Sequence, residues 1–337
     1  MVRIIPHGLA AARSAGLRRW RRQRRQRRQL ARLPGVTHAL PQPPAYAGDA
    51  IRWAAARLAR APLAYGHGTD NAHDEAAALV FGAAGWAHEA APAAYRWVLP
   101  RAARAALARL LALRIRKRIP SAYLTGRTWF AGHEIRVDAR VLVPRSPIAE
   151  LIERRLRPFV EPARVRRILD LGTGSGCIAI AAAHAFPRAR VDATDLSPAA
   201  LEVARDNVRR HGLEGRVRTR LANVYDGLGT DRYDVIVSNP PYVPSRELAA
   251  LPAEYRREPR LGLAAGRAGL AAVRAILAGA ARHLAPGGLV IVEVGDTAAA
   301  VARAWPRLRF LWLEFERGGG GVFLLDREQL RSRRALP

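Results

Sequence analysis

The chain has 337 residues, half of them apolar, which is enough for two domains that each bury a core of their own. Its single cysteine, Cys177, excludes a disulfide framework and a cysteine-based zinc site, and we expect no metal site. The formal charge of +28 favours anionic partners, above all nucleic acid or a particle rich in it. No apolar run has the length of a transmembrane helix, and no signal-peptide core follows the basic N-terminus, so we expect a cytoplasmic protein without a membrane partner.

Residues 1–45 are strongly basic, with eleven arginines and no acidic residue. Like charges at this density repel one another, which predicts a disordered tail. One interpretation is an arm that docks on RNA. The simpler interpretation, which we favour, is an extension without a role, or even an upstream start-site artefact. A second short tail is expected at 331–337.

The pattern over 46–120 is helical and predicts a small domain for substrate recognition. An Ala-rich helix is expected from Ile51, a second over 74–81 with Asp74 as its N-cap, and a third over 101–118 with Leu107, Leu110, Leu111 and Ile115 on one face. His67 lies in a turn-rich loop between these helices. It is either a ligand or base, or, as is more common for a lone histidine in a glycine turn, structural or merely exposed.

Residues 121–150 are expected to connect two domains and to line their cleft. Trp129-Phe130 and 135–138 flank Ala131-Gly132-His133, a pattern that predicts a β-hairpin, and helical spacing returns over 148–156. Two roles are open for Arg145. It either binds a substrate or cofactor carboxylate, or forms a salt bridge with Glu150 or Glu153.

Strands and helices alternate over 151–330, which predicts a mostly parallel sheet covered by helices on both faces. Strands are expected at 166–171, 190–194, 217–222, 234–238, 289–294, 308–313 and 322–325, and helices at 176–186, 198–211, 268–284 and 297–304. Ser197 and Pro198 are typical of the start of the second of these helices. The glycine-rich stretch 317–321 permits an antiparallel hairpin between the last two strands. Seven strands that end in such a hairpin are typical of the class I methyltransferase sheet.

A glycine loop follows the first of these strands and begins a helix. It contains Asp170 and then Gly172-Thr173-Gly174-Ser175-Gly176. Glycines at this position let the backbone approach a ligand closely. The spacing differs from that of a dinucleotide loop, and the preceding acid favours a ligand with an ammonium group and no phosphate.

Polar residues also follow the second and third strands. Asp195, with Leu196 beside it, stands where an acid can bind both hydroxyls of a ribose. Asn223 stands where it can bond an adenine amino group, with Val224 or Tyr225 packed on the ring. Asn223 as a mere turn residue is an alternative that stays open.

The fourth strand, Asp234–Ser238, ends at Asn239-Pro240-Pro241-Tyr242. Proline cannot donate to a ladder, so these residues lie at the carboxyl end of a buried strand, where open α/β sheets bind ligands. The Asn239 side-chain oxygen and the Pro240 carbonyl can accept the two hydrogens of a planar NH2 group, and Tyr242 can cover its flat face. The alternative is a proline-rich turn. Together, the four strand ends indicate S-adenosylmethionine and an NH2 acceptor.

Two further residues near these motifs receive no catalytic role. Cys177 lies in an apolar helix after the glycine loop, so we expect it to pack. Glu293 alternates with apolar neighbours on the fifth strand, where we expect it to bond a loop backbone.

These motifs resemble those of the HemK-like methyltransferases, which modify glutamine side-chain amides in translation proteins. The resemblance rests on 170–176, Asp195 and 238–243, and on the connector segments Ala122-Tyr123-Leu124-Thr125-Gly126 and 141–145. The run after Arg145, with 65–71 and 251–259, is similar to the ribosomal branch of the family. The resemblance covers residues 46–330 but not the basic tail. It also shows one departure, since Asn223 stands where the family commonly has Asp.

The resemblance implies a class I fold with S-adenosylmethionine as cofactor, bound by Asp170, Gly172, Thr173, Gly174, Ser175, Gly176, Asp195, Leu196, Asn223, Val224 and Asn239. It implies Asn239, Pro240, Pro241, Tyr242 and Arg145 at the substrate, with Asn239, Pro240 and Tyr242 as catalytic residues. The implied substrate is a glutamine of the third large-subunit ribosomal protein. The positive charge favours ribosomal RNA as an additional partner, through the basic surface or the tail. The alternatives are a release-factor glutamine methyltransferase, an adenine-amino methyltransferase of DNA or RNA, and a ribosome-assembly protein without activity.

Overall fold

A mixed sheet occupies the C-terminal part of the protein. The computed structural model describes residues 40–87, 93–266 and 269–331. Within them, seven strands lie in the order β5-β4-β3-β6-β7-β9-β8. Their bounds are β3 (Arg167–Leu171), β4 (Arg190–Asp195), β5 (Val217–Leu221), β6 (Tyr233–Ser238), β7 (Leu284–Glu293), β8 (Leu311–Leu313) and β9 (Val322–Asp326). Each expected strand is confirmed, and so is the closing antiparallel hairpin of β8 and β9.

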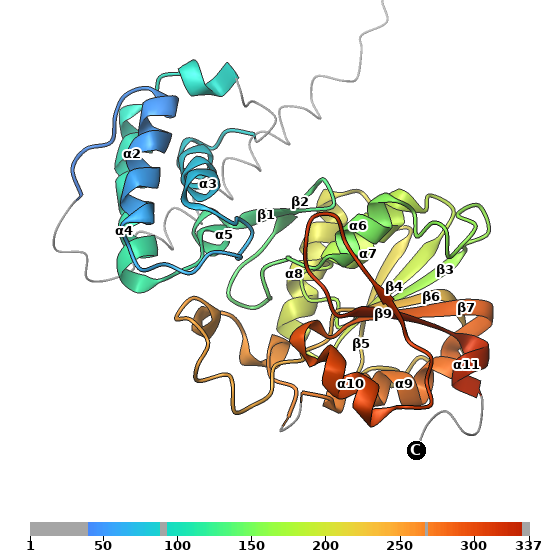
Figure 1. The fold of residues 1–337 in the computed structure, drawn as a ribbon. Coiled ribbons are helices and arrows are strands. Elements are labelled where there is room, and N and C mark those ends of the chain that lie inside the picture. Colours follow the sequence, from blue (N-terminus) through green and yellow to red (C-terminus); the bar gives the residue numbers. More distant parts are fainter. Residues whose placement is uncertain (1–39, 88–92, 267–268, 332–337) are drawn as a thin grey trace, which may run out of the picture. The chain divides into compact units, whose positions relative to one another are not determined.

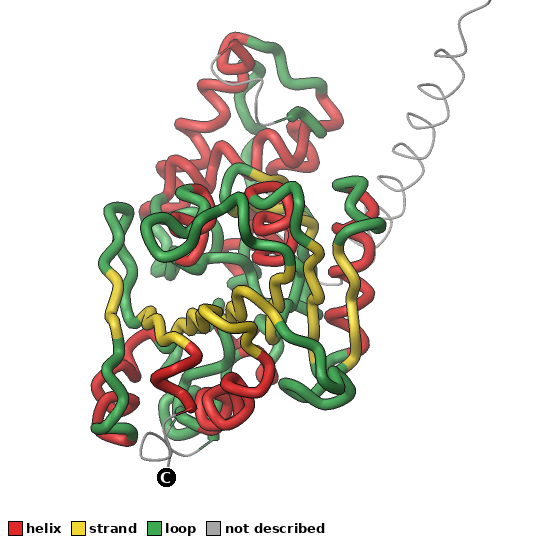
Figure 2. Tube along the Cα trace, turned by 90° about the vertical axis from the view of Figure 1, so that its right-hand side faces the viewer, coloured by secondary structure: helices red, strands yellow, loops and turns green. Residues whose placement is uncertain are grey.

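Helices cover both faces of this sheet, as Figure 2 shows. They are α6 (Ile148–Glu153), α7 (Cys177–Ala185), α8 (Pro198–Arg210), α9 (Ala271–His283), α10 (Ala298–Ala304) and α11 (Arg327–Arg331). Successive residues of a strand point to opposite faces of the sheet and pack into two separate apolar cores. Ile168, Val235 and Ile291 pack with α6, α7 and α8, whereas Ile236 and Val290 pack with α9, α10 and α11. The near-continuous apolar runs in the sequence follow from this burial on both sides.

The sequence upstream of the sheet forms helices α2 (Ala47–Ala59), α3 (Ala72–Ala84) and α4 (Arg101–Lys117), which lie beside one another in Figure 1. The N-cap of α3 is Asn71, whose side chain accepts a hydrogen bond from the Asp74 backbone nitrogen at 2.9 Å. The prediction of Asp74 as the cap is therefore wrong by three residues. Asp74 instead accepts a hydrogen bond from the Asn71 side-chain amide at 2.8 Å. Its negative charge in the first turn also interacts favourably with the helix dipole.

The expected hairpin joins these helices to the sheet. Strands β1 (Arg127–Phe130) and β2 (His133–Arg136) pair antiparallel, with Ala131 and Gly132 at positive φ in the turn. A short helix, α5 (Ser121–Thr125), precedes them and was not expected. Helix α6 ends at Glu153, three residues before its expected end, because Arg155 and Leu156 adopt positive φ.

Residues from Pro41 onward form one compact unit. The order of helices, hairpin and sheet is as expected, whereas the domain boundaries at 45, 120 and 150 stay predictions. The predictions for the two tails fall mainly on 1–39 and 332–337, which lie outside the described residues. No helix within the described ranges is long and apolar enough to cross a membrane.

Candidate active site

The carboxyl ends of four neighbouring strands, β5, β4, β3 and β6, lie side by side. The register pairs Leu171 of β3 with Thr194 of β4 and with Ser238 of β6, so the glycine loop lies between Asp195 and Asn239. The register of β4 with β5 then places Asn223 beyond Asp195. A cavity of about 380 Å³ opens at these strand ends, within the size range of small-molecule sites. Its lining includes most of the predicted site: Arg145, Gly172, Thr173, Gly174, Ser175, Asp195, Leu196, Asn223, Val224, Asn239, Pro240 and Pro241.

Three predicted residues do not line this cavity. Asp170 is fully buried beneath the glycine loop, where its Oδ2 accepts bonds from the Thr173 hydroxyl at 2.5 Å and the Ala179 nitrogen at 3.1 Å. Gly176 caps α7 and lies against Ala204 of α8, so that a Cβ there would be 3.3 Å from the Ala204 Cβ. The third residue is Tyr242. Asp170 and Gly176 shape the loop in this structure, and direct cofactor contact by either stays a prediction.

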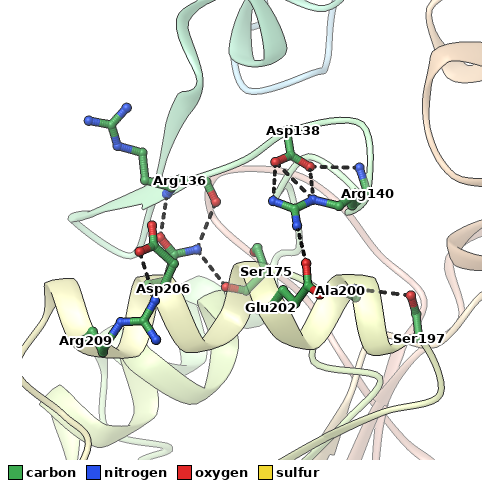
Figure 3. Close-up of polar contacts among 10 residues, drawn as sticks. Arg136, Asp138, Arg140, Ser175, Ser197, Ala200, Glu202, Asp206 and Arg209 are labelled. Atoms are coloured by element: carbon green, nitrogen blue, oxygen red, sulfur yellow. Dashed lines mark hydrogen bonds and ion pairs between the residues drawn. The ribbon is translucent and has the colours of Figure 1, made fainter. Parts of the chain in front are cut away.

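Asp195 lines the cavity, and backbone hydrogen bonds fix its side chain. Its Oδ2 accepts a bond from the Gly174 nitrogen at 2.8 Å, and its Oδ1 accepts one from the Ser197 nitrogen at 2.8 Å. Ser197 in turn caps α8 by accepting a bond from the Ala200 nitrogen, as expected and as Figure 3 shows. These backbone bonds fix the Asp195 carboxylate in place, and each oxygen keeps a lone pair for a further donor such as a ribose hydroxyl.

Asn223 and Val224 follow β5 and face the same cavity. Val224 adopts φ +54°, an unusual conformation for a β-branched residue that a tight turn imposes here. Tyr225, the alternative ring partner, is instead engaged elsewhere. Its hydroxyl donates to the Ile276 carbonyl at 3.0 Å and its ring stacks on His283. Of the two alternatives for the adenine ring, Val224 lines the cavity and Tyr225 does not, so Val224 remains the candidate.

Asn239 and Pro240 present free acceptors to the cavity. In the described part of the chain, no hydrogen bond uses the Asn239 side chain or the Pro240 carbonyl. The preceding residue is fixed, because the Ser238 hydroxyl donates to the Leu171 carbonyl at 2.7 Å. After the prolines, Val243 pairs with the backbone around Ala264 in a parallel bridge. The acceptors are thus unpaired although the backbone on both sides is held.

Tyr242 points to Glu293. The tyrosine hydroxyl donates to Glu293 Oε1 at 3.3 Å, and its ring lies so close to Gly295 that a Cβ there would be 2.7 Å from it. The Ser146 hydroxyl donates to the other oxygen of the carboxylate. Burial raises the pKa of Glu293 to about 7. The expected bond of Glu293 to a loop backbone is therefore wrong, since both partners are side-chain hydroxyls. Contact of Tyr242 with an acceptor group stays a prediction.

Arg145 forms a salt bridge with a partner that the sequence did not suggest. Its guanidinium donates twice to Glu258, at 2.7 and 2.6 Å, and the Glu258 side chain is fully buried. The predicted partners Glu150 and Glu153 are wrong, because both lie against Arg317 instead. Arg145 still lines the cavity, and Glu258 in the loop after the Asn-Pro-Pro-Tyr segment balances its charge.

A second ion-pair network attaches the same loop to the N-terminal helices. Arg114 of α4 is 1% exposed and donates to Glu75 of α3 at 2.5 Å and to Glu254 at 2.8 Å. Arg118 also pairs with Glu254, at 2.8 Å. The arginines of α4 were expected around its apolar face, and no local pattern distinguished Arg114 from them. The acids at 254 and 258, four residues apart in a basic chain, are the only sequence signal for this anchoring.

The connector is joined to the cofactor loop through α8. The Asn207 amide donates to the carbonyls of Arg136 and Ser175, at 2.9 and 2.8 Å, and its oxygen accepts from the Arg136 nitrogen. Arg140 bridges Asp138 and Glu202 above the same helix, as Figure 3 shows. The hairpin, α8 and the glycine loop are therefore connected by buried and exposed polar bonds that sequence reasoning did not identify.

Cys177 packs as expected, and His67 is buried rather than exposed. Cys177 packs against the core beside the cavity, and burial raises the pKa of its thiol to about 12, which makes it a poor nucleophile. His67 is 3% exposed, and burial lowers its pKa to about 4. Its ring lies edge-on to Tyr255 and lines a second cavity, beside α3, rather than the one at the strand ends.

The residues at the strand ends fit S-adenosylmethionine. Asp170 Oδ1 is buried without a hydrogen-bond partner, and burial raises the pKa of this carboxyl to about 7, so a cationic amine would satisfy it. Gly172 and Gly174 adopt φ +72° and +55°, and a Cβ on either would meet no atom within 4 Å, which leaves space for a ligand beside the backbone. Together with the strand order, this site defines a class I S-adenosylmethionine-dependent methyltransferase.

Comparison with known proteins gives the family. Residues 154–251 match the family described as Methyltransferase small domain. The chain is 46% identical over 286 residues to the ribosomal protein uL3 glutamine methyltransferase of Bordetella pertussis, covering 84% of this chain and 96% of that protein. It is 45% identical over 284 residues to the protein of the same name from Neisseria meningitidis, covering 84% and 93%. A methyltransferase structure from Pyrococcus furiosus aligns at 22% identity with a TM-score of 0.41, covering 57% of this chain and 88% of that one.

The chain belongs to the family of the ribosomal protein uL3 glutamine methyltransferases. The resemblance drawn from its motifs is confirmed, and the enzyme class with it.

Proposed function

We propose that this protein transfers a methyl group from S-adenosylmethionine to the side-chain amide nitrogen of a glutamine in uL3, the third protein of the large ribosomal subunit. The observation that carries the proposal is the pair of unpaired acceptors, the Asn239 side chain and the Pro240 carbonyl, at the edge of the cofactor cavity. The names of the relatives support the choice of uL3.

Positioning supplies most of the catalysis in this proposal. A glutamine amide nitrogen is a poor nucleophile, because its lone pair is delocalised into the carbonyl. Bonds from its two N–H groups to Asn239 and Pro240 orient that nitrogen toward the cavity. S-adenosylmethionine, when bound, supplies an electrophilic methyl group on a sulfonium. The N-alkylated amide is strongly acidic, so its proton leaves to solvent without a strong base.

The surroundings of the acceptors favour glutamine over adenine. A flipped base is usually held between aromatic side chains, yet the described lining of the cavity contains no aromatic residue. The lining includes residues of the connector and of the loop around Leu261, which Glu254 and Glu258 anchor. Such a lining suits a peptide loop.

The N-terminal helices supply a second surface for the substrate. A cavity of about 440 Å³ lies between α3 and the connector, and Asp70, Asp74 and Trp129 are among its lining residues. Acidic groups are scarce in this chain and would attract a basic ribosomal protein. The helical domain then recognises the substrate, and the basic surface is a candidate contact for ribosomal RNA. Both roles, and a cytoplasmic location, are parts of the proposal.

An acceptor panel tests the proposal. The enzyme is incubated with methyl-labelled cofactor and, separately, with free uL3, with a release factor and with duplex DNA. We expect label in uL3 alone. Free uL3 should also be labelled more readily than uL3 in assembled ribosomes, where the substrate loop would be buried. Label in adenine or in the release factor alone would contradict it.

A further inference from the structure

Three histidines from separate elements meet on the surface away from the cofactor cavity. His133 begins β2, His184 lies in the last turn of α7, and His211 is the C-cap of α8. One ring nitrogen from each lies within 4.8 Å of the others, and among the described residues this is a group with the ligand set of a transition-metal site. None of the three lines the cavity at the strand ends.

The spacing of two ligands already suits zinc. Zinc–nitrogen bonds of about 2.0 to 2.1 Å place two ligands of a tetrahedral ion about 3.4 Å apart. His184 Nε2 and His211 Nδ1 are 3.4 Å apart. The His133 ring is stacked on that of His184, with centroids 4.4 Å apart, and one of its nitrogens lies within 4.8 Å of the ligand atoms of the other two.

A neighbouring bond fixes the tautomer of His211. Its Nε2 lies 2.9 Å from the Glu134 carbonyl oxygen, which only accepts, so Nε2 carries the hydrogen. The lone pair is therefore on Nδ1, the atom that faces His184. A backbone carbonyl on the far nitrogen is the usual support for a histidine that binds a metal.

The site is open to solvent on one side. His184 is exposed, which leaves a path for an ion and room for a water ligand.

We propose that His133, His184 and His211 bind a divalent transition metal, zinc foremost, and that the ion ties the β1–β2 hairpin to α7 and α8. Helix α7 follows the glycine loop directly, and Asn207 of α8 already holds both the Arg136 backbone and the Ser175 carbonyl. The ion would add a second attachment beside Asn207, with no part in the methyl transfer itself.

Zinc titration of chelator-treated full-length protein tests the site. The variants are His184→Ala and His133→Ala, and His73→Ala, an exposed histidine of α3, is the matched control. Wild type and control should share a zinc site whose affinity falls more than about 100-fold in each cluster variant, because the loss of an outer-shell partner alone costs about 10- to 100-fold. Far-UV circular dichroism verifies that the variants fold. Equal zinc affinity in all four proteins would overturn the proposal and leave a hydrogen-bonded histidine cluster.

Hydrogen exchange tests whether the ion attaches the β1–β2 hairpin to α7 and α8. Added zinc should slow amide exchange in residues 127–136 of wild type and of His73→Ala, and leave it unchanged in His184→Ala. Zinc that binds without slowing exchange in the hairpin would contradict the tie, because the ion would then not join the hairpin to the helices.

Discussion

In the proposed site Asn239 and Asp195 have different roles, because Asn239 would bind the acceptor amide and Asp195 the ribose of the cofactor. Asn239→Ala removes an acceptor for the substrate amide but leaves the glycine loop and Asp195 in place. We expect methyl transfer to be lost while the dissociation constant of S-adenosylmethionine changes little. Isothermal titration and a methylation assay measure the two quantities on the same preparation.

Asp195→Ala is the contrasting variant. Losing a charge-assisted contact should weaken cofactor binding by about 1.5 to 3 kcal/mol, whereas Glu214→Ala, an exposed acid after α8, should have no effect. An Asn239→Ala protein that loses cofactor binding but keeps turnover would refute the division of roles.

Glu293 makes stability depend on pH. Burial raises its pKa from 4.5 to about 7, so the folded state favours the neutral acid and loses stability as pH rises between these values. Glu293→Gln keeps a group that can bond Ser146 and Tyr242 but cannot ionise. Its gain in unfolding free energy over wild type should grow from about 1 kcal/mol at pH 5 to about 3 kcal/mol at pH 8. Urea unfolding at both pH values measures it, and a difference that does not grow with pH would count against it.

Elements whose signal is local were predictable from sequence, and tertiary partners were not. Apolar runs that end at glycine, acid or proline located β3, β4 and β6, and the parallel order then placed their ends together. Glu258, the partner of Arg145, and Glu254, one of the two partners of Arg114, lie more than a hundred residues away, so only the fold selects them. The α3 cap was misplaced because Asn71 and Asp74 are both good caps. The histidine cluster has no spacing motif, since three elements bring it together.

The Arg114 network is expected to contribute strongly to the attachment of the N-terminal helices. Arg114→Met removes the cation between two buried carboxylates, those of Glu75 and Glu254. Leaving buried charges without their partner typically costs about 3 to 5 kcal/mol. Arg116→Met, an exposed residue of the same helix, is the control and should change the unfolding free energy by less than about 0.5 kcal/mol. Equal losses in both variants, measured by urea unfolding, would show that the network is not what stabilises this contact.

The whole molecule carries a net charge of +28, and eleven of its positive charges lie in residues 1–40. Deleting them leaves +17, since that segment has no acidic residue. No motif of the site lies there, so folding and methylation of free uL3 should persist. If ribosomal RNA takes part in the encounter, association with an RNA-bound substrate should slow at low salt and match the full-length rate at high salt. A truncated protein that cannot fold would show that the segment is structural.

In the function proposed above, this protein methylates a glutamine of uL3 through Asn239. The most direct measurement is tandem mass spectrometry of uL3 from cells that lack the gene and are supplied with either the wild-type protein or Asn239→Ala. We predict one added methyl on a uL3 glutamine with wild type, and none with Asn239→Ala or with an empty vector. A methylated uL3 glutamine in the empty-vector cells, or an unmodified uL3 with wild type, would contradict the account.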